Sequence, residues 1–438
     1  MPWNPTPERP AVPEAVRVSP SGIRGRLSPP PSKSAAHRAL LCAALAGGGE
    51  VRGVLDSQDM QATVGALPAL GALPSWKGET VALAPAAPPP GAPAVVDCGE
   101  SGSTLRFLIP LFAAKGLPAV FTGRGRLPER PLGVYGDCLP PHGVALEGPG
   151  GGRSLPLRVS GRLRAGRFSL PGDVSSQFVT GLLLALPLCG GESEIVLTTP
   201  LESAAYVTMT VEAMARAGVR AERTPAGWRV PGGQRYRPHS ETVEADWSQA
   251  AFLLAAGALG GEVRLTGLNP ASSQGDREAL ALFRRFGASV EETAEGLICR
   301  RAPLHGIEID ASQIPDLVPV LAVTAALAEG TTRITGAARL RLKESDRLAA
   351  VAHCLRLLGG RVEEQADGLT IEGQARLPGG AAVPGCNDHR IVMSMAVAAL
   401  GCEKPVTITD AGSVRKSWPS FFTDFQKIGG DVHGLEYR

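Results

Sequence analysis

The sequence predicts an α/β protein made of six βαβαββ repeats, grouped three and three into two globular domains. Two interleaved series of helix-start signals carry this prediction, because each recurs at roughly 70 residues, a fixed period typical of repeat architectures. The first series begins at Ser34, Ser101, Ser175, Asp246, Asp316 and Asn387. The second begins at Asp59, Pro131, Ser203, Asp276, Ser345 and Ser417. Alanine-rich helices can resemble one another by chance, but two series that share one period make chance a poor explanation.

The first helix of the chain has the pattern that the later units repeat. Lys33 precedes a hydroxyl cap at Ser34, an Ala/Leu-rich body follows, and residues 47–49 form a glycine stop. Arg38 lies one turn inside the helix. Cationic side chains and free backbone N–H groups therefore meet at one helix end, an arrangement that suits an anion.

Strand-like runs fill the rest of each unit. One run, such as 262–266 or 405–409, lies between the first and second helix. Two or three short alternating runs follow the second helix, for example 289–293, 296–300 and 306–310. The order predicted for each unit is therefore strand and helix twice, followed by a hairpin.

The two ends of the chain predict how the units are grouped. Residues 15–19 and 22–27 look like strands, whereas the sixth unit is short because few residues follow residue 430. We therefore expect residues 15–30 to complete the sixth unit, with the chain crossing between the halves near residues 31 and 244. The expected domains are 32–244, and 1–31 together with 245–438.

Composition excludes several classes of protein. Lys and Arg total 44 against 42 Asp and Glu, for a net charge of +2, and only 5% of residues are aromatic, which argues against nucleic-acid binding. The eight cysteines form no CxxC pair or zinc spacing and are typical of buried thiols in a reducing compartment. No signal-peptide core or apolar run of about 18 residues occurs, so we expect a cytoplasmic protein without membrane spans.

Two proline-rich stretches have simpler explanations. We expect residues 1–14 to form an arm and residues 82–93 to form a surface connector inside the first unit.

Cations at the helix starts are the strongest indication of a site. A helix N-terminus disfavours Lys or Arg, so these residues cost stability there unless an anion compensates. A single capped helix start needs no function, but several cationic ones together predict a site for phosphates or carboxylates. The cations concerned are Lys33, Arg38, Arg106, Lys343, Arg390 and Lys416.

Acidic residues and one histidine accompany these cations. Glu344 could be only a first-turn acid paired with Arg347, Asp316 only a cap, and His389 only a hydrogen-bonded histidine. Carboxylates among so many cations nevertheless favour chemistry over simple anion binding. No Walker sequence, dinucleotide fingerprint, nucleophile–base set or metal-ligand spacing is readable.

At Lys33-Ser34-Ala-Ala-His-Arg38, Leu342-Lys-Glu-Ser-Asp-Arg347 and Asn387-Asp-His-Arg390 the chain resembles the enolpyruvyl transferase family, over residues 15–430. The resemblance implies six βαβαββ units in two halves of the inside-out α/β barrel type, joined by two crossings. It also implies transfer of the enolpyruvyl group of phosphoenolpyruvate to the 5-hydroxyl of shikimate 3-phosphate, with release of phosphate. The expected protein is a monomer that needs no metal or organic cofactor and has only these small-molecule partners.

The resemblance also implies roles for individual residues. Asp316 would engage the 5-hydroxyl as a base, and Glu344, with Lys33 nearby, would move the proton at the methylene carbon. The residues expected to bind shikimate 3-phosphate are Lys33, Ser34, Arg38, Ser175, Ser176, Gln177, Ser203, Asp316 and Lys343. The residues expected to bind phosphoenolpyruvate are Lys33, Gly102, Arg130, Gln177, Arg347, Arg390 and Lys416.

Two departures limit what the resemblance implies. The segment Glu100-Ser-Gly-Ser-Thr-Leu-Arg-Phe107 replaces the Asn-Ala-Gly-Thr-Ala-Met-Arg-Pro of the best-known members, so it gives no expectation for glyphosate sensitivity. Arg339 stands where some members have an asparagine that touches the acceptor ring, and no role is carried over to it.

Three other functions stay open. A sister enzyme that uses UDP-N-acetylglucosamine as the acceptor shares the donor, but it typically has Lys-Asn at Lys33-Ser34 and a cysteine within residues 122–131, where this chain has none. An RNA 3′-phosphate cyclase uses related units, and the near-neutral charge argues against it. The third alternative is a non-catalytic phosphometabolite-binding repeat protein.

Overall fold

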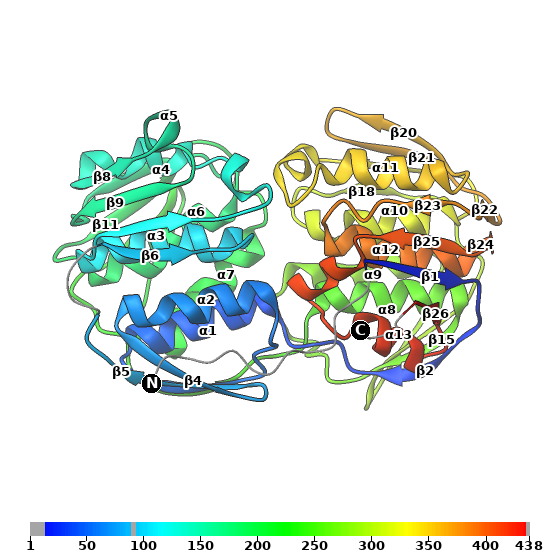
Figure 1. Ribbon diagram of the computed structural model, residues 1–438, viewed down its shortest axis with the longest axis horizontal. Coiled ribbons are helices and arrows are strands. Elements are labelled where there is room, and N and C mark those ends of the chain that lie inside the picture. The colour runs from blue at the N-terminus through cyan, green and yellow to red at the C-terminus, as the bar shows by residue number, and fades with distance from the viewer. Residues whose placement is uncertain (1–13, 89–92, 435–438) are drawn as a thin grey trace.

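The computed structural model describes residues 14–88 and 93–434. Residues 1–13 of the expected arm and 89–92 of the expected connector lie outside this range. Residues 82–85 of the expected connector belong instead to a strand, Thr80–Pro85, which pairs with a neighbouring strand on each side. Figure 1 shows the elements in two lobes that lie side by side.

Each lobe holds three small mixed sheets, every one with a parallel pair followed by two antiparallel pairs. In the first lobe the sheets, in strand order, are β14 (His239–Thr242), β3 (Gly49–Arg52), β5 (Thr80–Pro85), β4 (Ala72–Lys77); β6 (Ala94–Asp97), β7 (Ala119–Thr122), β9 (Leu157–Gly161), β8 (Val144–Glu147); and β10 (Arg167–Leu170), β11 (Ser193–Leu197), β13 (Gly227–Val230), β12 (Glu222–Thr224). Their helices are α1 (Lys33–Leu45), α2 (Gln58–Leu70), α3 (Gly102–Lys115), α4 (Gly133–Cys138), α5 (Pro149–Gly152), α6 (Ser176–Ala185) and α7 (Ala204–Arg216).

The second lobe repeats the arrangement. Its sheets are β2 (Ile23–Leu27), β15 (Gly261–Leu265), β17 (Gly296–Arg300), β16 (Ser289–Thr293); β18 (Glu308–Asp310), β19 (Thr331–Thr335), β21 (Gly368–Glu372), β20 (Arg361–Gln365); and β23 (Ala382–Val383), β25 (Val406–Thr409), β1 (Ala15–Ser19), β26 (Asp431–His433), with a small parallel pair of β22 (Leu377–Gly379) and β24 (Cys402–Lys404). Its helices are α8 (Trp247–Gly260), α9 (Ala279–Phe286), α10 (Val318–Ala326), α11 (Arg347–Leu357), α12 (His389–Ala398) and α13 (Phe421–Lys427).

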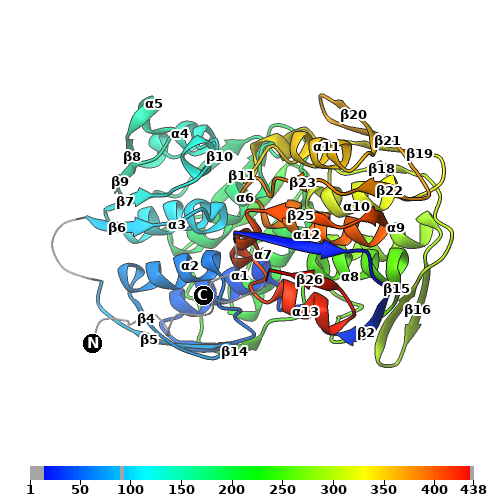
Figure 2. The same cartoon turned by 45° about the vertical axis from the view of Figure 1, so that its right-hand side comes forward.

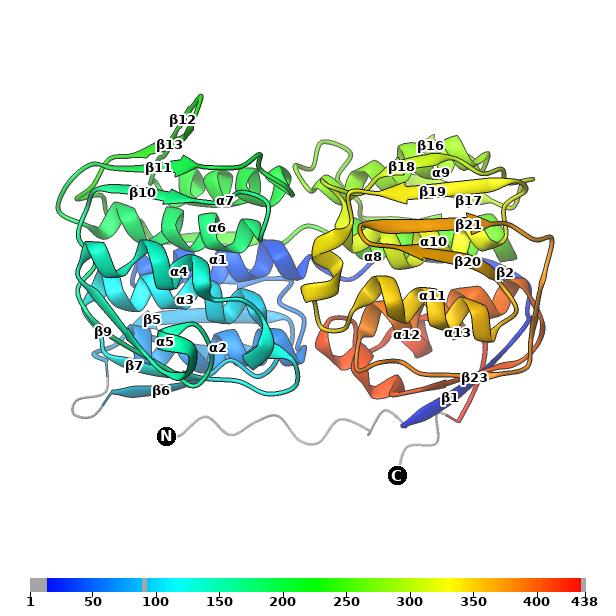
Figure 3. The same ribbon diagram turned by 90° about the horizontal axis from the view of Figure 1, so that it is seen from above.

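Helices fill the interior of each lobe and the sheets lie outside them (Figure 3). Helices α8, α10 and α12 are buried along nearly their whole length, because they carry mostly apolar or small side chains on every side. The buried apolar residues form two separate clusters. One spans residues 36–243, and the other combines residues 16–23 with residues 247–432.

The N-terminal strands are shared between two units, which corrects the expectation that residues 15–30 complete the sixth unit. Strand β1 does join the sixth sheet, between β25 and β26 (Figure 2). Strand β2 instead pairs in parallel with β15 of the fourth sheet, from Ile23↔Gly261 to Leu27↔Leu265. Strand β14, which directly precedes α8 in the sequence, pairs with β3 of the first sheet. The two strands have therefore exchanged places between the lobes.

The two chain crossings hydrogen-bond to each other. The Ser32 N–H donates to the Glu244 carbonyl at 2.8 Å, and the Asp246 N–H donates to the Pro30 carbonyl at 2.9 Å. Pro31 and Ala245 form an antiparallel bridge between these bonds. The crossings are thus one two-stranded connection.

The helix caps agree only in part with the expected starts. Ser101, Ser175 and Asp246 accept backbone N–H bonds as N-caps, as predicted. Ser32, and not Ser34, caps α1 by accepting from the Ala35 N–H at 3.4 Å, and Asp388 rather than Asn387 caps α12. Asp316 caps nothing, because a 3₁₀ turn over Pro315–Leu317 precedes α10. In the sixth unit, α13 starts at Phe421 rather than near Ser417. No helix within the described residues is long and apolar enough to cross a bilayer.

Candidate functional site

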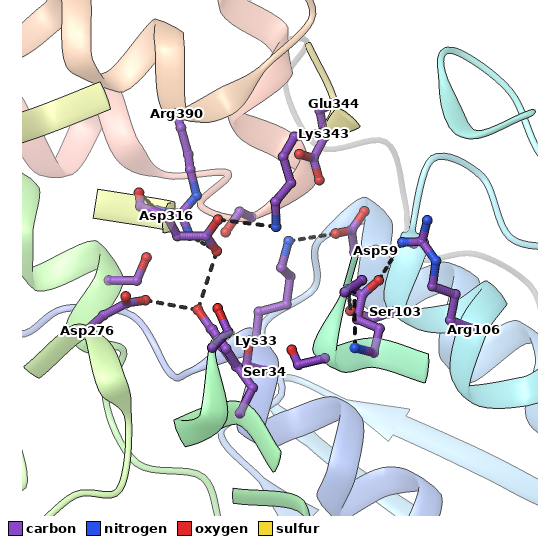
Figure 4. Close-up of a pocket in the computed structure, with 18 of the residues that line it drawn as sticks. Lys33, Ser34, Asp59, Ser103, Arg106, Asp276, Asp316, Lys343, Glu344 and Arg390 are labelled. Atoms are coloured by element: carbon purple, nitrogen blue, oxygen red, sulfur yellow. Dashed lines mark hydrogen bonds and ion pairs between the residues drawn. The ribbon is translucent and has the colours of Figure 1, made fainter. Parts of the chain in front are cut away.

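A polar pocket lies between the two lobes, at the N-terminal ends of several helices (Figure 4). Helices α1, α3 and α6 and the loop before α4 supply its first wall, and the turns before α10, α11 and α12 supply the second. All of the sequence-predicted site residues except Lys416 line it: Lys33, Ser34, Arg38, Gly102, Arg130, Ser175, Ser176, Gln177, Ser203, Asp316, Lys343, Glu344, Arg347 and Arg390.

Asp316 lies among three cations of its own lobe. Its carboxylate is 2.9 Å from Arg347 Nη1, 3.1 Å from Arg390 Nη2 and 3.8 Å from Lys343 Nζ. Burial alone would raise the pKa of Asp316, but the charges of Arg390, Lys343 and Arg347 hold it well below its usual range. The group is therefore a carboxylate at neutral pH.

Glu344 connects the two walls of the pocket. Its Oε2 accepts from Arg347 Nη2 at 2.7 Å, and its Oε1 is 3.6 Å from Arg130 Nη1 in the opposite lobe. Burial opposes ionisation, yet these two guanidinium groups hold the pKa of Glu344 well below its usual range. The proton affinity of Glu344 therefore rises if Arg347 and Arg130 bind another anion.

Arg347 is fixed from behind by a buried acid that the sequence did not single out. Asp388 Oδ2 accepts from Arg347 Nε at 2.8 Å and from the Ser345 hydroxyl at 3.0 Å. Asp388 is fully buried and also caps α12 through the Arg390 N–H. One carboxylate thus orients the Arg347 side chain and caps the helix that begins beside Arg390.

Lys33 has a similar partner on its own lobe. Its Nζ is 2.6 Å from Asp59 Oδ2 in the first turn of α2, and the ammonium lies near the middle of the pocket (Figure 4). On the other side of the pocket, burial lowers the pKa of Lys343 to about 8, an effect that the charge of Asp316 opposes. Each lysine therefore has a carboxylate of its own lobe nearby, Asp59 for Lys33 and Asp316 for Lys343.

Arg38 and Gln177 are held by protein partners. Arg38 donates to the Thr210 hydroxyl, the Ser34 carbonyl and the Tyr206 carbonyl at 2.8, 2.6 and 2.8 Å, and burial lowers its pKa to about 10. Gln177 Oε1 accepts from Arg106 Nη1 at 2.7 Å, and its amide donates to the Ser103 hydroxyl at 3.0 Å. These contacts hold Arg38 and Gln177 in place on the first-lobe wall of the pocket.

A second acidic group lies beside Asp316. The Tyr206 hydroxyl is 2.9 Å from Asp276 Oδ2 and 3.4 Å from Asp316 Oδ2. The phenol belongs to the first lobe and therefore bridges two carboxyl groups of the second. Burial, together with the charge of Asp316, raises the pKa of Asp276 to about 7. Among the described residues, Asp276 Oδ1 is buried without a hydrogen-bond partner. Sequence analysis had taken Asp276 for a helix start only.

Such a pocket can hold polyanions next to a carboxylate base and a second carboxyl group of adjustable proton affinity. The sequence profile of the family described as EPSP synthase (3-phosphoshikimate 1-carboxyvinyltransferase) matches residues 18–425. The chain belongs to this family. Among similar curated proteins, the 3-phosphoshikimate 1-carboxyvinyltransferase of Clostridium acetobutylicum is 43% identical over 423 residues, which cover 95% of this chain and 98% of the relative. The Clostridium kluyveri protein of the same name is 41% identical over 419 residues.

Solved structures agree with the family assignment. An EPSP synthase from Acinetobacter baumannii superposes with a TM-score of 0.79 at 26% identity and covers 96% of this chain and 99% of its own. The enolpyruvyl transferase NikO from Streptomyces tendae matches with a TM-score of 0.76 at 20% identity, a likeness of fold alone. The chain therefore has the EPSP synthase fold, with six small mixed four-stranded sheets.

In this EPSP synthase family member, Arg339 and Ser203 lie together at the seam between the lobes. Ser203 has a left-handed backbone, with φ at 53°, and its hydroxyl accepts from Arg339 Nη2 at 2.7 Å. Arg339 Nε is also 2.7 Å from Glu202 Oε2. The arginine thus joins the lobes through protein contacts beside the pocket.

Lys416 is the one expected site residue that lies outside the pocket lining. It is in the 3₁₀ turn over Ala411–Lys416, and its Nζ contacts Glu100 Oε2 at 2.8 Å and the Asn387 carbonyl at 2.5 Å. Its neighbour Ser417 does line the pocket. In residues 14–88 and 93–434 no group of His, Cys, Asp and Glu is arranged to hold a metal ion.

Proposed function

We propose that this pocket binds shikimate 3-phosphate and phosphoenolpyruvate together and transfers the enolpyruvyl group to the 5-hydroxyl, with release of phosphate. The observation that carries the proposal is the convergence of cations from both lobes on two carboxylates. Each substrate brings a phosphate and a carboxylate, so together they carry roughly five or six negative charges, given a second phosphate pKa near 6. Lys33, Arg130, Lys343, Arg347 and Arg390 line the same space.

We assign shikimate 3-phosphate to the side of the pocket that holds Ser34, Ser175, Ser176, Ser203 and Lys343, with Arg38, Lys33 and Gln177 at its edges. Asp316 accepts the proton of the 5-hydroxyl. A carboxylate with a depressed pKa is a weak base, so it removes this proton only as the oxygen bonds to an electron-poor carbon. The flanking cations keep Asp316 ionised and ready for that moment.

We assign phosphoenolpyruvate to the side that holds Gly102, Arg130, Gln177, Arg347 and Arg390, with Lys33 between the substrates and Lys416 beyond. Glu344 delivers the proton to the methylene carbon. The arginines that now keep Glu344 ionised bind the donor's anionic groups instead, and the pKa of Glu344 then rises because its ion pairs weaken. Donor binding thereby prepares the acid.

The reaction proceeds in two balanced steps. In the first, the methylene carbon gains a proton, the 5-oxygen loses one, and a new C–O bond gives a tetrahedral adduct. In the second, Glu344 takes back a proton from the methyl carbon and the C–O bond to phosphate breaks, which restores the double bond; phosphate leaves with the proton that Asp316 had accepted. The residues assigned above supply both proton transfers, so we propose no cofactor.

We infer a first domain of residues 32–244 and a second of residues 1–31 with 245–438, each made of three βαβαββ units of the inside-out barrel type. Two separate apolar clusters and the paired crossings support these limits. We further infer a monomer that works in the cytoplasm with these two small-molecule substrates, in keeping with eight free cysteines.

Phosphate release from phosphoenolpyruvate tests the proposal directly. The purified protein should release phosphate when shikimate 3-phosphate is the only acceptor. UDP-N-acetylglucosamine as the only acceptor should give none. Release with UDP-N-acetylglucosamine alone would assign the sister activity, and release with neither acceptor would leave only a binding protein.

A further inference from the structure

Glu100 and Lys416 form an ion pair between the lobes next to the proposed donor site. Glu100 follows β6 in the first lobe, directly before the α3 cap, and Lys416 precedes α13 in the second. Their Oε2 and Nζ atoms are 2.8 Å apart, and the side chains are only 18% and 4% exposed. The pair is therefore largely shielded from water.

The carboxylate of Glu100 is built into its surroundings. Asn387 Nδ2 donates to both Glu100 oxygens, at 3.2 and 3.0 Å. The backbone of Gly125 packs against the same carboxylate, and a side chain at Gly125 would collide with it. Lys416 in turn donates to the Asn387 carbonyl at 2.5 Å. Glu100 is thus a fixed anion that reaches Lys416 from the opposite lobe.

We propose that Glu100 sets the affinity for the donor by cancelling the charge of Lys416, and so acts as an internal competitor of phosphoenolpyruvate. The inference rests on the proposed function, in which Lys416 belongs to the donor set. An ammonium already paired with a carboxylate attracts a second anion less strongly than a free one. Donor binding must therefore weaken this pair or do without the full charge of Lys416.

A clasp that merely holds the lobes together is the competing explanation. A buried ion pair contributes little net stability, because the loss of hydration offsets the attraction. Removal of the charge of one partner is costly, because it leaves the other charge buried and uncompensated. Without the negative charge at Glu100, Lys416 would lack compensation until the donor's anion arrived. The competitor model therefore predicts tighter donor binding in such a variant, and the clasp model predicts weaker binding.

Glu100→Gln separates these outcomes, because glutamine keeps an oxygen for the Asn387 amide and loses only the charge. We expect the KM for phosphoenolpyruvate to fall by about tenfold, the scale of one added unit charge near a bound anion. The KM for shikimate 3-phosphate should change little. The variant should also have a lower Tm than the wild type without substrates, and a larger Tm rise when both are added. Glu147→Gln, at an exposed position in β8, is the matched control and should change none of these values.

Lys416→Met tests whether the effect passes through the lysine. Glu100→Gln should leave the KM for phosphoenolpyruvate unchanged when it is combined with Lys416→Met. An unchanged or higher KM in the single Glu100→Gln variant would overturn the inference while activity with shikimate 3-phosphate kept the proposed function intact. Absence of that activity in the wild type would overturn the proposed function itself.

Discussion

The two carboxylates at the centre of the pocket are tuned by the same arginine. Arg347 contacts Asp316 at 2.9 Å and Glu344 at 2.7 Å, while Asp388 holds the guanidinium from behind. A substrate anion that binds Arg347 weakens both ion pairs at once. An anion bound to Arg347 would therefore change the proton affinities of Asp316 and Glu344 together.

Glu344→Gln should lower kcat by roughly 10²-fold or more, the usual scale for a positioned acid or base. Binding of shikimate 3-phosphate should change little, because Glu344 is assigned to the donor side. Steady-state kinetics and calorimetric titration measure the two quantities. Glu363→Gln, at an exposed position in β20, is the control. Near-normal turnover of the Glu344 variant would show that Glu344 serves only as an ion-pair partner of Arg347.

Asp276 gives a prediction for stability against pH. The unfolded chain releases this proton near pH 3.9, and the folded protein holds it to about pH 7, because burial and the charge of Asp316 oppose ionisation. Asp246 adds to that repulsion, whereas Arg390 and the Tyr206 hydroxyl reduce it. Since the folded state binds more protons in this window, the free energy of unfolding should fall as pH rises from about 4 to about 7.

Asp276→Asn should remove that contribution. The free energy of unfolding of the wild type, relative to the variant, should decrease by up to about 1.4 kcal/mol per pH unit between pH 4 and 7. Urea unfolding of both proteins at several pH values gives this difference. Asp137→Asn, at an exposed position, should show no such trend. A difference between wild type and Asp276→Asn that is constant with pH would show that the carboxyl group is ionised throughout.

Sequence could identify the cations but not the acids that hold them. Lys33, Lys343 and Arg390 stand out because helix starts disfavour positive charge. Asp59, Asp276 and Asp388 do not, because an acid at a helix start is the commonest cap. Their roles come from contacts with other units of the repeat, and such contacts leave no local signal. Lys416 was expected among the donor residues from the resemblance, and its contact with Glu100 of the other lobe leaves no local signal in the sequence.

Helix starts are the elements on which the site depends, and α3 is the clearest case. Ser101 caps α3 by accepting from the Thr104 N–H at 3.2 Å and from its hydroxyl at 2.7 Å. The Thr104 hydroxyl also hydrogen-bonds with the Thr63 hydroxyl at 2.6 Å, and the Thr63 hydroxyl in turn hydrogen-bonds with His37 Nδ1 at 2.9 Å. This buried chain joins α3, α2 and α1 below the pocket. It fixes the start of α3, where Gly102 lines the pocket.

Gly102→Ala should disturb the donor side without disturbing the fold. A Cβ at this position would lie 2.8 Å from three atoms of the Arg130 guanidinium, so the arginine must move. We expect the KM for phosphoenolpyruvate to rise by roughly tenfold or more, because small displacements of positioning groups are costly. Steady-state kinetics with each substrate varied in turn measures the effect. Gly65→Ala in α2 has open space around it and is the matched control. An unchanged donor KM would show that Arg130 does not position the donor.

At the scale of helices and strands the repeat pattern was informative, because strongly periodic sequences predict these elements well. The cap at Ser34 and the helix start near Ser417 were wrong by one or two residues and by about one turn, respectively, because several hydroxyl residues compete at each site. The place of β2 was wrong for a different reason. Its partner β15 is far away in the sequence, and such a long-range pairing leaves no local signal.

The whole molecule is two lobes around one charged space. Cations of the first lobe, such as Lys33 and Arg130, face Lys343 and Arg390 of the second. Contacts between the lobes, including Arg130 with Glu344 and Arg339 with Ser203, complete the pocket. Within residues 14–88 and 93–434 only two chain crossings join the lobes, so relative motion of the lobes meets little covalent resistance.

We expect substrate binding to close the lobes and to be synergistic. Shikimate 3-phosphate should bridge the walls and neutralise part of their charge, so phosphoenolpyruvate should bind more tightly in its presence, and linkage requires the reverse effect to be equal. Small-angle scattering should give a smaller radius of gyration for the ternary complex than for the free protein. Protein with phosphoenolpyruvate alone is the control. An equal radius and independent affinities would contradict closure but not the reaction.

The exchange of β2 and β14 also sets an order for synthesis on the ribosome. Strands β1 and β2 leave the ribosome first, yet β2 has no partner until β15 is made, and β1 waits for β25 near the end of the chain. The first lobe, by contrast, is complete once β14 has been translated. At elongation rates of roughly 5–20 residues per second, β1 stays unpaired for tens of seconds beside a finished lobe. Strands β1 and β2, although made early, are thus among the last strands to pair.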